Sequence, residues 1–108
     1  MEDTKKVKQE TEAEKIARLE AKHGHIMVIS FDDGEHMDYI KKPSRQVKDK
    51  VLGAIKDAHH FAAEIMLENC LIRPESSSII LEDDNYLLGA FQAAQEFIKI
   101  KQFEIKKN

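Results

Sequence analysis

The sequence predicts an α+β fold that is mainly helical, with three helices and one β-hairpin in its N-terminal half. Apolar residues recur at steps of three and four in three stretches, residues 10–23, 44–71 and 84–98, as amphipathic helices require. Between the first two stretches, over residues 25–40, the apolar period falls to two. The chain has 108 residues, the size of one domain. We expect residues 10–108 to form that domain and residues 1–9 to be a flexible N-terminus.

The first predicted helix begins at Glu10 and ends at Gly24. Ile16 and Leu19 give it a thin apolar stripe, and small or charged residues surround them. Glycine is common just beyond a helix C-terminus because it adopts left-handed backbone angles without strain. Gly24 therefore predicts the end of this helix and the start of the hairpin.

Residues 25–31 and 36–40 are β-branched and apolar, and Asp33-Gly34 lies between them. Asp-Gly between two such runs is a strong signal for a two-residue hairpin turn, which would pair Val28 with Tyr39. One face then carries Ile26, Val28, Met37 and Tyr39, and the other carries Met27, Ile29, Phe31, His36, Asp38 and Ile40. An isolated hairpin is marginally stable in water, so helices or another subunit should cover these faces.

The central stretch predicts one continuous helix from Ser44 to about Leu71. Ser44 follows Pro43 and is a favourable N-cap, because its hydroxyl can accept a backbone N–H of the first turn. Two adjacent apolar stripes follow, Val47, Val51, Ala54, Ala58, Phe61 and Ile65 in one, and Leu52, Ile55, His59, Ala62 and Met66 in the other. Together they make an apolar arc wider than one partner helix usually covers.

The last predicted helix begins after Asp83 or Asp84, either of which can cap it. Its two apolar stripes are Leu87, Phe91, Ala94 and Ile98, and Tyr86, Ala90, Ala93 and Phe97. The short apolar run at residues 79–81 is expected to be a strand stub or a loop plug. The tail beyond Ile98 alternates apolar residues with lysines and fits a helix or a strand equally well.

Composition indicates a cytoplasmic protein. Cys70 is the single cysteine, so no internal disulfide can form and a reducing compartment is expected. The N-terminal segment is charged and lacks the apolar core of a signal peptide. No apolar run approaches the roughly 20 residues that a membrane-spanning helix needs.

Charge is distributed unevenly along the chain, although the net charge is only −3. Residues 41–56 contain six basic residues and one acid, whereas residues 57–84 contain seven acids and one arginine. Two interpretations are open: ordinary solvated helix faces, or complementary patches that steer self-association or a partner. A nucleic-acid-binding regulator is a further alternative, suggested by the basic cluster at residues 41–50. The near-neutral net charge, the acidic residues that follow and the absence of aromatic residues within this cluster count against it.

The side chains that usually carry chemistry do not form a recognisable site in this sequence. The histidines lack the spacing of metal ligands, and a hairpin turn explains Asp32-Asp33-Gly34-Glu35 better than a calcium loop does. Cys70 lies in an apolar helical pattern and is expected to be an inert core thiol. We therefore predict a protein that is not an enzyme and binds neither a metal nor a cofactor.

The order of motifs resembles that of small tail assembly chaperones of long-tailed phages and prophages. A short charged helix precedes HIMVISFDDGEHMDYI and KKPSRQVKDKVLGAIKD, and then come AAEIMLENCLI and ILEDDNYLLGAFQAAQEF, so the resemblance covers residues 15–98. Arg73-Pro74-Glu75 stands where members of that family often have a glycine-acid turn. The resemblance implies a non-enzymatic protein of the bacterial host cytoplasm that binds the tape measure protein and keeps its hydrophobic helical segments soluble during tail assembly.

A chaperone for apolar helices needs a groove or a wide apolar arc that accepts anchors at i, i+3, i+4 and i+7. The wide arc of the central and last helices is the candidate surface, with Leu52, Ile55, Met66, Phe91 and Phe97 as the expected protein-binding residues. The same residues could instead fill the core of the monomer. The alternative function is a small oligomeric adaptor or structural subunit, which would assemble as a homo-oligomer and bind no such client.

Overall fold

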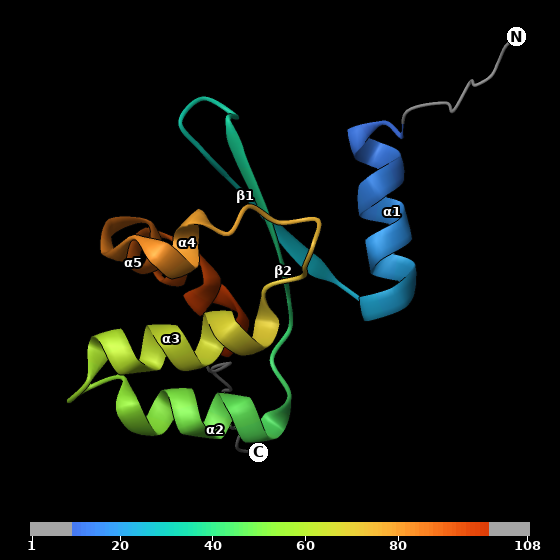
Figure 1. The fold of residues 1–108 in the computed structure, drawn as a ribbon. Helices are drawn as coiled ribbons and strands as arrows, with labels where there is room; N and C mark the ends of the chain where they lie inside the picture. Colours follow the sequence, from blue (N-terminus) through green and yellow to red (C-terminus); the bar gives the residue numbers. More distant parts are fainter. Residues whose placement is uncertain (1–9, 100–108) are drawn as a thin grey trace, which may run out of the picture.

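The computed structural model describes residues 10–99 as an α+β fold, mainly helical, with a two-stranded antiparallel hairpin (Figure 1). In chain order the elements are α1 (Glu12–His23), β1 (Ile26–Phe31), β2 (His36–Lys41), α2 (Arg45–Ala54), α3 (His59–Cys70), α4 (Ile79–Glu82), α5 (Asp84–Ala94) and the 3₁₀ turn η1 (Gln95–Ile98). The predicted fold class is confirmed, but residues 10–99 contain five α-helices rather than three. Residues 1–9, expected to be flexible, and the ambiguous tail from residue 100 lie outside the described part.

The hairpin forms in the predicted register, with Val28 opposite Tyr39. Asp33 and Gly34 have φ angles of 55° and 89°, and Asp32 before them has a φ of 54°. Positive φ at both central residues is what a type I′ turn requires, and the twist of that turn matches the twist of paired strands. The turn residues therefore fix which side chains face each side of the hairpin.

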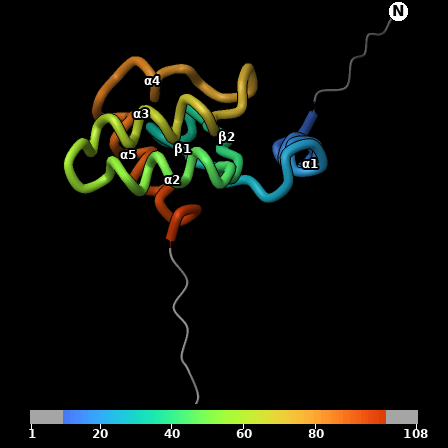
Figure 2. Tube along the Cα trace, turned by 90° about the horizontal axis from the view of Figure 1, so that it is seen from below, coloured from blue at the N-terminus to red at the C-terminus, as the bar shows by residue number. Residues whose placement is uncertain are grey.

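Different helices cover the two faces of the hairpin, and α1 stands apart from the others (Figure 1, Figure 2). On one face Leu19 of α1 packs with Ile26, Tyr39 and Ile72, and these four buried side chains form the α1 cluster. The Tyr39 hydroxyl also donates a hydrogen bond to the Glu12 carboxylate at 2.6 Å. α1 thus covers the part of this face around Ile26 and Tyr39, whereas Val28 on the same face is exposed, and the main core covers the other face.

The chain that leaves α3 runs along the outer edge of β2. The Ile72 amide donates to the Tyr39 carbonyl at 2.8 Å, and the Ser77 amide donates to the Met37 carbonyl at 3.0 Å. These bonds satisfy backbone groups of β2 that would otherwise be unpaired at the sheet edge. They also place Ile72 in the α1 cluster, while Leu71 beside it lies in the main core. The segment after α3 therefore contacts both clusters.

The continuous helix predicted from residue 44 to residue 71 is wrong, because the chain folds back at residues 55–58 into two antiparallel helices, α2 and α3. Ser44 caps α2 as predicted, accepting a first-turn amide at 3.2 Å. Ala58 leaves the helical conformation, with φ −142° and ψ 70°, and makes no side-chain cap. A straight 28-residue helix would be roughly 40 Å long and would leave much of its apolar arc in water. The fold-back buries Val51 completely.

The main core lies between the second face of the hairpin and helices α2 to α5. Asp83 caps α5 as expected, accepting the amides of Asn85 and Tyr86. The run at residues 79–81 forms the single-turn helix α4 instead of a strand stub or loop plug, and it buries Ile80. The buried side chains of the main core are Ile40, Val51, Ala62, Ala63, Met66, Leu67, Cys70, Leu71, Ile80, Leu87, Ala90, Phe91, Ala94 and Ile98. No helix within residues 10–99 is long and apolar enough to cross a membrane.

Leu19→Ala should loosen α1 selectively, because the α1 cluster is separate from the main core. Truncating a buried leucine to alanine costs about 2–5 kcal/mol, and here the loss falls on the contact between α1 and the hairpin. We expect faster amide hydrogen exchange in α1 and little change in α5. Ala17→Ser, at an exposed position of α1, is the control. Equal acceleration in α1 and α5 would contradict the separation of the two clusters.

Candidate functional site

An open groove runs between α2 and α3 on the solvent-facing side of this helical hairpin, with a volume of about 670 Å³. We call it the α2–α3 groove. Its lining residues are Gln46, Val47, Lys50, Gly53 and Ala54 from α2, and Phe61, Glu64, Ile65, Glu68 and Asn69 from α3. On each helix these positions recur at steps of three and four, so each helix presents one continuous ridge to the groove. Figure 2 shows the two helices side by side, as Figure 1 does.

Phe61 is the most exposed large apolar side chain among residues 10–99, with 57% of its surface accessible. Single exposed apolar residues are common on protein surfaces and need no explanation. Phe61 is different because it shares a concave surface with Val47, Ala54 and Ile65. The groove therefore has an apolar floor with an aromatic ring at its margin, which is the composition of protein-binding surfaces.

The two walls of the groove carry opposite charges. Lys50 stands on the α2 wall, and Glu64 and Glu68 stand on the α3 wall. Within the described residues none of these three forms an ion pair. The fold-back thus brings one basic residue of the stretch 41–56 and two acidic residues of the stretch 57–84 to the same groove.

Gly53 leaves a gap in the α2 wall. A Cβ atom added to Gly53 would meet no atom within 4 Å, so this position faces open space. A glycine in a helix interior costs about 1 kcal/mol relative to alanine. Here the absent side chain lets a neighbouring backbone or ring approach α2 closely.

The five residues predicted to bind a partner do not form one surface. Met66 and Phe91 are 0% exposed in the main core, which is the alternative position that the sequence left open for them. Leu52 and Ile55 are half-buried on another side of α2, and Phe97 is half-buried on η1. A second, shallower groove brings together Leu52, Ile55, Gln92, Gln95, Glu96, Ile98 and Lys99.

The groove was missed because the helix break was missed. On a straight helix the stripe with Leu52 and Met66 and the stripe with Val47 and Phe61 are equivalent partner faces. The fold-back turns Met66 inward and leaves Phe61 and Val47 at the outer seam between two helices. The available signal was Gly53, because a glycine inside a helical pattern weakens the helix, and on its own this is weak evidence for a break.

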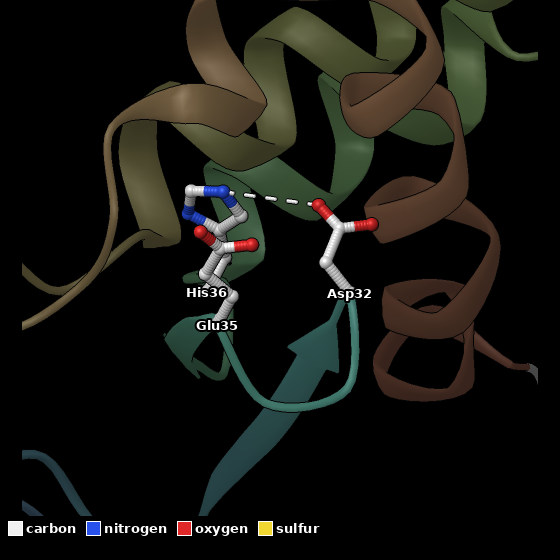
Figure 3. A group of neighbouring side chains, drawn as sticks. All are labelled: Asp32, Glu35 and His36. Atoms are coloured by element: carbon white, nitrogen blue, oxygen red, sulfur yellow. Dashed lines mark ion pairs between the residues drawn. The ribbon is translucent and has the colours of Figure 1, made fainter.

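The hairpin turn carries a cluster of side chains that could hold a metal ion, Asp32, Glu35 and His36, whose potential ligand atoms lie within 4.8 Å of one another (Figure 3). Two of the three already have contacts in the chain. Asp32 accepts a hydrogen bond from the Tyr86 hydroxyl, and His36 Nδ1 lies 3.2 Å from the Ser77 hydroxyl. These contacts tie the hairpin tip to α5 and to the segment before α4, and we assign the cluster to that structural role.

Cys70 is buried near the end of α3. Burial raises the pKa of its thiol to about 11. Because the thiolate is the reactive form, the thiol is protonated and unreactive at neutral pH. The expected core position of Cys70 is confirmed.

Asp38 is fully buried, and within the described residues neither carboxylate oxygen has a hydrogen-bond partner. Burial of the Asp38 carboxyl raises its pKa to about 6. The neighbouring His36 ring and the Ser77 amide act in the opposite direction and lower the pKa. Because the Ser77 amide donates its hydrogen bond to the Met37 carbonyl, it does little to stabilise the ionised Asp38 carboxylate. A buried carboxylate without a partner destabilises the folded protein whenever it is ionised.

Comparison of the chain with protein-family models, with curated proteins and with solved structures finds no match. The site is therefore interpreted from its own geometry. The α2–α3 groove combines an apolar floor, an exposed aromatic ring and a charged rim. Protein–protein interfaces likewise combine an apolar centre, enriched in aromatic residues, with a polar rim.

Asp38→Asn should stabilise the protein at neutral pH. The folded-state pKa is raised to about 6 from an ordinary 3.8, so the unfavourable term is present above pH 6 and disappears as the pH falls below 4. We expect the variant to gain about 1–3 kcal/mol at pH 7.5 and to converge with the wild type near pH 4. Urea unfolding from pH 4 to 8 measures the difference. Exposed Asp49→Asn is the control, and a gain independent of pH would contradict the assignment to Asp38.

Proposed function

We propose that this protein is a non-enzymatic holding protein that binds an amphipathic helix of a client protein in the α2–α3 groove. The observation that carries this proposal is Phe61, with 57% of its surface exposed beside the apolar floor of an open groove. Exposing a large aromatic ring to water is unfavourable. A client helix that covers it gains the free energy of removing apolar surface from water.

The dimensions of the groove suit one helix. α2 has 10 residues and α3 has 12, so at 1.5 Å per residue the walls are about 15–18 Å long. Anchors at positions i, i+3 or i+4, and i+7 of a client helix span about 10 Å. A client helix of three turns therefore fits along the groove with its apolar stripe on Phe61, Val47 and Ile65, and its polar side facing water.

The client that fits the resemblance is the tape measure protein of a long-tailed phage or prophage. In tail assembly chaperones, binding keeps hydrophobic helical segments soluble until tail tube subunits replace them. A holding role of this kind requires release as well as binding. The groove is open and its rim is polar and charged, and such a surface buries less apolar area than an obligate interface does. This is the geometry of a reversible contact.

The alternative is a small oligomeric adaptor, and the opposite charges on the groove walls favour it as a second candidate. An adaptor would form a defined oligomer and would leave the solubility of a tape measure fragment unchanged. The two functions are therefore separable by one solubility measurement. Both are protein-binding functions, and neither needs a cofactor.

Phe61→Ser should abolish most client holding. Because the aromatic anchor is lost while the core is untouched, we expect at least about tenfold weaker binding and a matching loss of soluble client. The experiment co-expresses this chain with a tape measure fragment encoded in the same genome and measures the soluble fraction of the fragment. Val28→Ser is the matched control, since Val28 is an exposed apolar residue on the hairpin, outside the groove.

Two results would count against the proposal. A fragment that is equally soluble with and without the wild-type chain would remove the holding function. A fragment held equally well by Phe61→Ser would remove the α2–α3 groove as its site. Loss of holding in Val28→Ser to the same extent would point to the hairpin instead.

A further inference from the structure

We propose that the α2–α3 groove, when it holds no client, is covered by the same groove of a second copy of this chain. The proposal concerns regulation of the proposed client site, and the part in which a client displaces the second copy rests on the proposed function. The dimer itself rests on the charges and the shape of the groove. Phe61 is then shielded in the free protein as well as in the client complex.

Charge complementarity indicates that the occupant of the groove is a second copy of this chain. Lys50 lies on one wall, Glu64 and Glu68 lie on the other, and within residues 10–99 they have no ion-pair partners. A surface with a lysine on one wall and two glutamates on the other is complementary to its own copy when Lys50 of each copy meets Glu64 and Glu68 of the other. In a two-fold symmetric contact each such pair occurs twice.

The same charges select the direction of the symmetry axis. An axis parallel to the helices places α2 of one copy over α3 of the other, so that Lys50 faces Glu64 and Glu68 across the interface. An axis perpendicular to the helices, in the plane of the interface, would place α2 over α2 and bring the two Lys50 side chains toward each other. Like charges facing one another in an interface are unfavourable, so the parallel axis is the arrangement that the groove favours.

The shape of the groove agrees with this arrangement. In the parallel-axis dimer the Phe61 ring of each copy lies over the α2 ridge of its partner, where Gly53 leaves open space and Val47 and Ala54 provide apolar floor. The aromatic ring then removes apolar surface of both copies from water. A client helix and a second copy use the same floor, so binding of one excludes the other.

The dimer is tested by reversing the charge of Lys50 or of Glu64 in the full chain and measuring dimerisation. Sedimentation velocity should show a concentration-dependent dimer for the wild type. Lys50→Glu and Glu64→Lys should each raise the dimer dissociation constant by at least about tenfold, because each places like charges opposite one another twice. An equimolar mixture of the two variants should dimerise again, because both pairs in the mixed dimer are then opposite in charge.

Two charge-changing variants outside the groove serve as controls. Lys42→Glu and Glu20→Lys make equal changes in net charge at exposed positions outside the groove, and each should dimerise as the wild type does. A wild-type chain that is monomeric up to about 1 mM overturns the dimer. So do single variants that dimerise normally, or a mixture that stays monomeric. A monomeric chain that still holds the tape measure fragment overturns the dimer alone and leaves the proposed function standing.

Discussion

The fold-back of α2 onto α3 is the constraint on which the rest of the structure depends. A chain this small cannot shield a straight central helix with two adjacent apolar stripes. By reversing direction at residues 55–58, the chain buries Val51 and Met66 in the core and leaves the seam between the two helices open. The core and the α2–α3 groove are therefore two results of one backbone reversal.

Much of the fold follows from local sequence signals. The Asp33-Gly34 turn determined the strand register, and Ser44 and Asp83 marked helix starts that the structure places at those residues. Each of these features depends on the chemistry of two or three neighbouring residues. Such local preferences act wherever the segment lies in the molecule, so they can be predicted from the sequence.

The site could be predicted only in part, because it depends on a tertiary event. The break at Ala58 has no proline and no capping side chain, and it forms because burial of the apolar arc outweighs the continuity of the helix. Periodicity identified the apolar positions, but it could not say which of them the fold would enclose. Each stripe is divided: Val51 is buried and Phe61 is exposed in one, and Met66 is buried and His59 is exposed in the other. Of the side chains chosen from the sequence, Met66 and Phe91 are therefore in the core, whereas Phe61, which was not chosen, is exposed beside the groove.

The hairpin contributes side chains to a separate core on each of its faces, and this has a consequence for errors in strand pairing. Alternate residues of β2 belong to different cores: Tyr39 enters the α1 cluster, and Ile40 enters the main core. A slip of one residue would invert this assignment along the whole strand, placing a tyrosine where the main core accepts an isoleucine. Inserting one residue into the turn would therefore damage both cores at once, whereas a substitution on either face damages one.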